Sequence, residues 1–107
     1  MARKKLDTLT EPMYYTLLSL LQPRHGYGIM QYISELTAGR VNVGAGTLYA
    51  LLARFEAEHL IVHTHTSENR KYYRLTEEGL HILTEEYHRL SRQAADAAGL
   101  LEKEVLP

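Results

Sequence analysis

GTLYALLARFEAEHLIVHTHTSENRKYYRL, residues 46–75, changes its hydrophobic spacing halfway along. Its first part repeats apolar residues at the i, i+3, i+4, i+7 spacing of one helix face: Leu48, Leu51, Leu52 and Phe55. From Leu60 to His65 the residues become β-branched and then alternate, and residues 71–75 form a second strand-like run. Residues 66–70 between these runs are turn-like. The stretch therefore predicts a helix followed by a β-hairpin.

Two further helices are expected before this stretch. The first carries the same spacing after a capping Thr10 and ends before Pro23, with one face made of Tyr14, Leu17, Leu18 and Leu21. The second begins near Gly26, ends at Gly39, and is expected to bury Ile29, Ile33 and Leu36. Only a few residues separate it from the third helix, as in a helix-turn-helix. Three helices and a hairpin predict a mainly α fold, a winged helix-turn-helix with a two-stranded β wing.

A long helix is expected after Thr76, a candidate N-cap with two glutamates in the following turn. Apolar residues recur along it with alternating spacings of three and four: Leu80, Leu83, Tyr87, Leu90, Ala94, Ala97 and Leu101. This seam predicts a dimer interface with a second chain, although packing on the chain's own first helix is an alternative that does not exclude it. We divide the single compact domain into a winged-helix region (residues 1–75) and a C-terminal dimerisation helix (residues 76–107).

Charge and composition bound the function. Residues 1–75 hold nine lysines and arginines against six acidic residues, whereas residues 76–107 hold three against seven. This asymmetry favours a phosphate-facing first part, although chance fluctuation in a short chain is an alternative. The absence of cysteine excludes disulfides and thiolate chemistry, and there is neither a signal peptide nor an apolar run long enough for a membrane span. With no catalytic motif or phosphate-binding glycine loop, we expect a cytoplasmic protein that is not an enzyme and needs no cofactor or metal.

The third helix has an outward face of small residues: Gly46, Ala50, Ala53 and Ala57. Such a face permits close approach to a DNA major groove, with Thr47, Tyr49 and Arg54 at its edges as contact residues. The alternative is that another helix packs on it. Basic side chains that could contact phosphates lie around the hairpin and near the N-terminus: Arg70, Lys71, Arg74, Arg3, Lys4 and Lys5.

Two other functions are compatible with parts of this pattern. Six histidines raise the question of a metal-responsive regulator, since His63 and His65 are expected to share one face of a strand. A winged helix that binds only proteins, as an adaptor, has the same fold and seam. Tyr72 and Tyr73 are expected to point to opposite faces of the wing.

Three motifs in order resemble the PadR-type transcriptional regulators: RHGYGI at 24–29, GTLY at 46–49 followed by Leu51 and Leu52, and RKYYRLTEEG at 70–79. The resemblance implies a dimeric repressor of the short subfamily, which binds double-stranded operator DNA with dyad symmetry. It assigns Tyr49 to the recognition helix and Arg70 and Lys71 to the basic wing. It also allows a small-molecule effector, although this chain lacks the tryptophan that holds flat aromatic ligands in some members. His59 stands where the family usually has glycine, and Ala45 and Ala50 replace frequent prolines.

Overall fold

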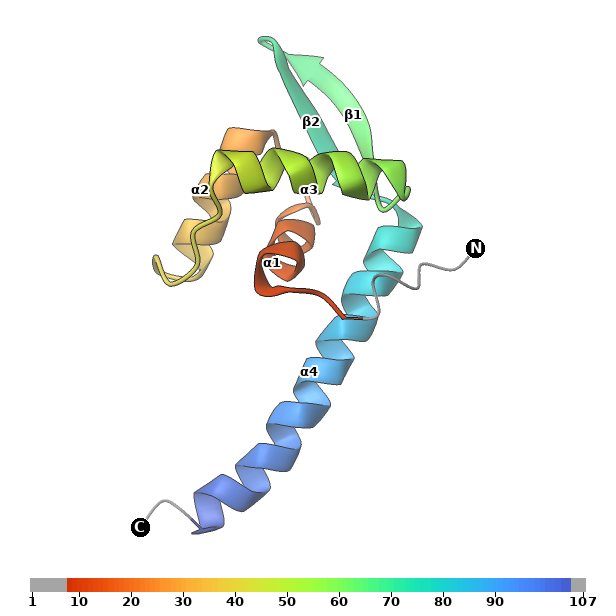
Figure 1. Cartoon of the computed structure of the whole chain (residues 1–107). Helices are drawn as coiled ribbons and strands as arrows, with labels where there is room; N and C mark the ends of the chain where they lie inside the picture. The colour runs from red at the N-terminus through yellow and green to blue at the C-terminus, as the bar shows by residue number, and fades with distance from the viewer. Residues whose placement is uncertain (1–7, 105–107) are drawn as a thin grey trace.

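A computed structural model describes residues 8–104 of the chain. Its elements follow the order α1 (Glu11–Ser19), α2 (Gly26–Leu36), α3 (Ala45–Ala57), β1 (Ile61–Ser67), β2 (Arg70–Leu75) and α4 (Glu77–Glu104) (Figure 1). This order confirms the predicted winged helix with a long C-terminal helix. No helix within residues 8–104 is both long and apolar enough to cross a membrane.

The first three helices enclose the core. Their fully buried side chains include Leu17 of α1, Ile29 and Ile33 of α2, and Leu48 and Phe55 of α3, as their spacing predicted. Two residues expected on these buried faces are instead half exposed: Leu21 and Leu36, each at 51%. The reason is that α1 ends at Ser19, so Leu21 lies in the turn beyond it, while Leu36 is the last residue of α2.

The hairpin is tighter than residues 66–70 suggested. Its two strands pair antiparallel from Ile61 opposite Leu75 to Ser67 opposite Arg70. Only Glu68 and Asn69 lie between the strands, and both have a left-handed backbone conformation, with φ of 51° and 64°. Two such residues in succession match the turn twist that two-residue hairpins prefer.

A register shift in β1 places its two central histidines on opposite faces of the wing. His63 pairs with Tyr73, whereas His65 pairs with Tyr72, so one extra residue is accommodated between the histidines. Because the two tyrosines are adjacent in an unbulged strand, their side chains point to opposite faces. Tyr73 packs against the core and Tyr72 does not. The prediction for the tyrosines is confirmed, and the prediction that His63 and His65 share a face is wrong.

The wing is anchored at two places. Arg24, in the turn between α1 and α2, exchanges backbone hydrogen bonds with Tyr73 at 3.0 and 2.9 Å, which adds a third short extended segment beside β2. At the other end, the backbone N–H of Leu75 donates to the carbonyl of Leu20 at 2.9 Å. These bonds fix the hairpin relative to the helix-turn-helix.

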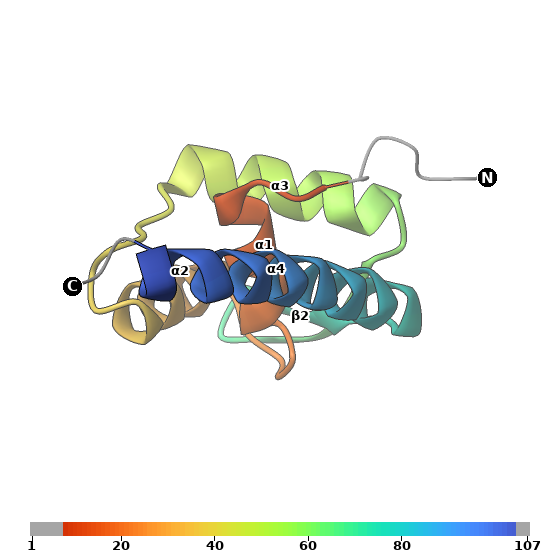
Figure 2. The same ribbon diagram turned by 90° about the horizontal axis from the view of Figure 1, so that it is seen from below.

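The long helix α4 belongs to the core only in its first part. The Thr76 hydroxyl accepts a hydrogen bond from the Gly79 N–H at 3.0 Å, which confirms the predicted cap. Ile82, Leu83 and Glu86 are buried, and Figure 2 shows the helix lying across α1. Beyond Arg89 its side chains up to residue 103 are exposed or half exposed, and this half projects away from the rest of the chain (Figure 1).

Candidate nucleic-acid interface

The outward face of α3 is open. Gly46, Ala50, Ala53 and Ala57 are all exposed, so no helix of residues 8–104 covers them and the alternative of intrachain packing is wrong. Thr47 is also exposed, in the first turn of the helix. An exposed helix face made of small residues lets the backbone of α3 come close to a concave surface such as a DNA groove.

A cavity of about 420 Å³ lies where the N-terminal ends of α2 and α3 meet the hairpin. It brings together three of the predicted DNA-contacting residues, Tyr49, Arg70 and Lys71. The complete lining is His25, Gly26, Tyr27, Tyr49, Asn69, Arg70, Lys71 and Tyr73. Because none of these residues carries a carboxylate, the cavity combines hydroxyl and imidazole groups with two cations and suits an anionic ligand.

Tyr49 is positioned by a glycine on the neighbouring helix. A Cβ atom at Gly26 would overlap the Tyr49 hydroxyl and lie 2.6 Å from its Cζ atom. The ring therefore rests on the backbone at the start of α2, while 54% of the residue remains exposed. The absence of a side chain at Gly26 is what lets the tyrosine occupy this place.

His25 joins α2 to the wing. Its Nδ1 atom accepts a hydrogen bond from the Gly28 N–H at 3.1 Å and so caps α2, while its Nε2 atom lies 3.1 Å from Nη1 of Arg70. The edge of its ring meets Tyr72, with ring centroids 5.0 Å apart. Burial lowers the pKa of His25, and the nearby charge of Arg70 lowers it further.

The wing contributes two stacked rings, those of His65 and Tyr72, and the cation of Arg70 near α2. His65 stacks on Tyr72 with ring centroids 4.4 Å apart. The guanidinium carbon of Arg70 lies 5.9 Å from the ring centre of Tyr27, at the outer limit of a cation–π contact. Arg70 directly follows Glu68 and Asn69, the two turn residues with left-handed backbone conformation. The tight hairpin therefore places the side chain of Arg70 next to α2.

The other residues predicted to contact DNA do not line this cavity. Arg54 is in the last turn of α3, where its Nε atom is 3.4 Å from a Glu58 carboxylate oxygen. Arg74 is at the root of the hairpin and donates to the Leu75 carbonyl at 3.0 Å. Lys4 and Lys5, like Arg3, fall outside the residues that the structure describes.

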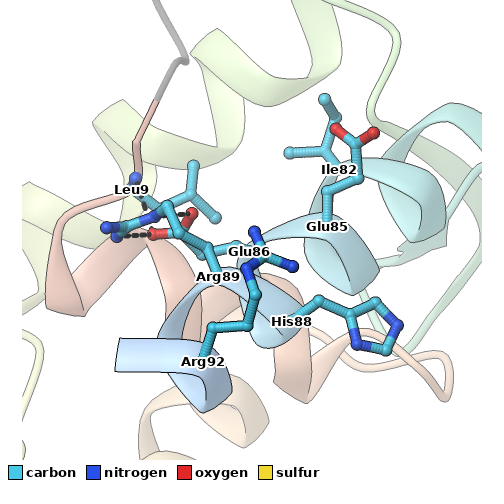
Figure 3. A pocket seen from close by; sticks show the side chains of 7 residues that line it. All are labelled: Leu9, Ile82, Glu85, Glu86, His88, Arg89 and Arg92. Carbon is cyan, nitrogen blue, oxygen red and sulfur yellow. Dashed lines mark hydrogen bonds and ion pairs between the residues drawn. The ribbon is translucent and has the colours of Figure 1, made fainter. Parts of the chain in front are cut away.

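A second cavity, of about 440 Å³, runs along α4 near the segment before α1 (Figure 3). Glu86 is one of its lining residues: one oxygen accepts from the Leu9 N–H at 3.2 Å, and both oxygens accept from Arg89, at 2.9 and 2.6 Å. The hydrogen bonds from Arg89 lower the pKa of this carboxyl, against the opposing effect of burial. Glu85, His88 and Arg92 complete the polar lining.

The predicted seam of α4 divides into two parts. Leu83 is only 5% exposed and belongs to the chain's own core, so it is not available to a second chain. The other seam residues are exposed: Leu80, Tyr87, Leu90, Ala94, Ala97 and Leu101. The apolar stripe that packs inward near Leu83 thus continues along the free half of the helix without a cover from residues 8–104.

Sequence reasoning missed five of the residues that line the cavity: His25, Gly26, Tyr27, Asn69 and Tyr73. The HGYG motif drew attention to the start of α2, but nothing in it indicated that the tip of the hairpin lies nearby. The metal-responsive alternative receives no support here. Within residues 8–104, no three histidine, aspartate or glutamate side chains converge as a metal site would require.

Comparison with known proteins gives a consistent result. Residues 16–85 match the profile of the Transcriptional regulator PadR-like family. A PadR family transcriptional regulator from Eggerthella lenta is 29% identical, with a TM-score of 0.71 over 85% of this chain and 81% of that one. A PadR-like transcriptional regulator from Bacillus cereus is 26% identical, with a TM-score of 0.71 over 84% of this chain and 90% of that one.

A curated relative extends the comparison to a larger protein. It is an uncharacterized 37.1 kDa protein in a transposon of Streptomyces fradiae, and it is 34% identical over 70 residues. These residues are 65% of this chain but 20% of that protein, so the match spans a fifth of the relative's length.

Proposed function

Because the chain belongs to the PadR-like family of transcriptional regulators, we propose that it binds a dyad-symmetric DNA operator as a homodimer and represses transcription. The observation that carries this proposal is that Tyr49, at the edge of the open face of α3, lines one carboxylate-free cavity together with Arg70 and Lys71 of the wing. The family is one of regulators and not of enzymes.

In this proposal α3 enters the major groove with its N-terminal end first. Thr47 and Tyr49 then present hydroxyl groups to base edges or phosphates, and Arg70 and Lys71 reach flanking phosphates. Arg54 contributes less than the sequence suggested, because Glu58 already neutralises its charge. Arg74 is left out of the interface, since it lies at the root of the hairpin.

A matched pair of double variants tests DNA binding. We expect Arg70→Ala with Lys71→Ala to weaken binding to a site selected from random duplexes by at least about tenfold. The same variant should reduce the slope of log K against log salt by about 1.8, for two lost phosphate contacts. Arg92→Ala with Lys103→Ala removes the same charge from α4 and should change neither quantity. Equal behaviour of both variants would contradict the proposal and favour the protein-binding adaptor.

The dimer is proposed to form along the free part of the α4 seam. Leu90, Ala94 and Leu101 extend the apolar stripe beyond the core, and a two-fold pairing of α4 helices would cover it. Ala94 and Ala95 are both exposed, but only Ala94 lies on the stripe. Ala94→Asp should therefore shift the protein toward monomer in sedimentation equilibrium, whereas Ala95→Asp should not. A monomeric wild-type protein would contradict this part of the proposal.

Repression is tested with the selected site placed over a promoter. The wild-type chain should lower expression of a reporter gene, and the variant lacking Arg70 and Lys71 should not. An effector that releases DNA would fit the cavity beside α4, whose volume lies in the usual range of small-molecule sites. A compound that acts there should lose its effect in Arg92→Ala while DNA binding without the compound stays unchanged.

A further inference from the structure

The imidazole of His25 is in contact with two hydrogen-bond donors. Its Nδ1 atom accepts from the Gly28 N–H, and its Nε2 atom faces Nη1 of Arg70, each at 3.1 Å. A neutral imidazole has one acceptor nitrogen and one N–H group. The tautomer in which Nδ1 accepts in the cap of α2 carries its proton on Nε2. In that tautomer the Nε2–H group and the guanidinium of Arg70 are two donors side by side, and neither can accept from the other.

We propose that His25 and Arg70 together bind one backbone phosphate of DNA, whose oxygen supplies the acceptor that this pair lacks. His25 acts as a neutral donor and Arg70 as the charge that the phosphate neutralises. This inference rests on the proposed function, and it assigns His25 a role beyond capping the helix.

The surroundings of the pair suit a phosphate. Both residues line the cavity beside α3, together with the cation of Lys71 and the carboxamide of Asn69. The cavity also adjoins the start of α2 at Gly26, where the first N–H groups have no partner within the helix and the helix dipole is positive. Imidazole, guanidinium and helix end thus all border the same cavity.

The histidine is also held in the orientation that this role needs. The hydrogen bond from Gly28 fixes one edge of the ring, and the edge-on contact with Tyr72 restrains its plane. Burial and the charge of Arg70 lower the pKa of His25, which favours the neutral form. A donor that is already oriented loses little conformational entropy when the phosphate arrives.

Two single variants separate the donor from the charge. His25→Asn retains a side chain that caps helices well but has no donor that reaches as far as Nε2. Arg70→Gln removes the cation and keeps a polar side chain. Lys103→Gln, on α4, serves as the charge-matched control because Lys103 is exposed and lines neither cavity. Binding is measured on a random-sequence duplex over a range of salt concentrations, because phosphate contacts do not depend on sequence.

We expect each of the two variants to weaken duplex binding by roughly tenfold, as for one hydrogen bond to a charged group. Arg70→Gln should lower the salt slope by about 0.9, whereas His25→Asn should leave the slope unchanged because a neutral donor displaces no cation. The double variant should be weaker than Arg70→Gln by less than about threefold, because the pair shares one phosphate. Lys103→Gln should behave as wild type.

The tautomer provides a readout that does not depend on affinity. Long-range ¹H–¹⁵N spectra of the full chain should show the proton of His25 on Nε2, and addition of the duplex should shift this signal. Inorganic phosphate at equal ionic strength should shift it much less, which distinguishes DNA from a free anion as the source of the phosphate.

The outcomes separate this inference from the proposed function. If the wild-type chain binds no duplex, both fail. If it binds with the expected salt dependence but His25→Asn binds equally well, only the inference fails. It is likewise overturned if the proton is found on Nδ1, or if the effects of His25→Asn and Arg70→Gln simply multiply in the double variant.

Discussion

The first turn of α4 approaches Leu60, in the connection between α3 and β1, so closely that Gly79 has no room for a methyl group. A Cβ atom there would overlap the carbonyl oxygen of Leu60 and lie 3.0 Å from its carbonyl carbon and 3.2 Å from Cδ2 of Leu75. The obstacle is chiefly backbone, which cannot rotate aside as a side chain can. We therefore predict that Gly79→Ala destabilises the fold.

The magnitude follows from what holds Leu60 in place. Its carbonyl accepts from the Thr76 N–H at 3.0 Å, and its own N–H donates to Phe55 at 2.9 Å. Making room for the methyl group means straining these bonds, and overpacking of this kind costs about 1–3 kcal/mol. Losing the bond to Thr76 would add about 1 kcal/mol. The higher helix propensity of alanine returns at most about 1 kcal/mol, so the net loss is about 1–3 kcal/mol.

The same helix provides the control. Apart from its chain neighbours and the nearby backbone of its own helix, no atom of residues 8–104 lies within 4 Å of a Cβ atom placed at Gly99, so Gly99→Ala should gain up to about 1 kcal/mol from helix propensity. Urea unfolding at one fixed protomer concentration measures both variants, and the midpoint should move in opposite directions at unchanged m. If Gly79→Ala were as stable as wild type or more so, the close approach of α4 to Leu60 would be wrong.

Three further predictions follow from single residues. Gly26→Ala should displace the ring of Tyr49 and weaken duplex binding several-fold, while the unfolding free energy changes by less than about 0.5 kcal/mol. Gly99→Ala serves as the control, and duplex binding by Gly26→Ala as tight as that of the control would show that the position of the ring does not matter for binding. His25 has a lowered pKa in the folded state, so its contribution to stability is present at neutral pH and is lost as pH falls below the unfolded value of about 6.5. Urea midpoints at about pH 7.5 and about pH 5.5 should therefore differ less in His25→Asn than in wild type, and an equal difference would contradict this. His59 is left-handed with φ of 63°, so His59→Gly should raise the unfolding free energy by about 0.5–1 kcal/mol in the same assay; a lower value would mean that the imidazole makes a compensating contact.

Local signals in the sequence predicted most of the architecture. Thr10 and Thr76 cap their helices, and Gly39 is left-handed with φ of 80° just after α2, because these features depend only on neighbouring residues. His59, which stands where the family usually has glycine, adopts the left-handed conformation that glycine would favour. The fold class was accessible for the same reason, since helix and strand periods are local.

The errors arose where one element depends on another far along the chain. The register shift between His63 and His65 reverses the face of a side chain, and no spacing in β1 announces it. The hairpin turn at Glu68 and Asn69 contains no glycine, so its tightness was not apparent either. The contact between His25 and Arg70 joins residues 45 positions apart, and only the folded hairpin brings them together.

The apolar stripe of α4 allowed two interpretations, a dimer interface and packing on the chain's own first helix, because its two halves have different surroundings. Leu83 of the stripe packs on the chain's own core, whereas beyond Arg89 the stripe continues on a free helix. The hairpin and the C-terminal end of α4 lie at opposite ends of the molecule (Figure 1). Pairing through the free half would therefore leave the cavity around Arg70 untouched. The two activities should then separate: Ala94→Asp should abolish preference for a dyad-symmetric site while each monomer keeps the wild-type salt slope for one half-site.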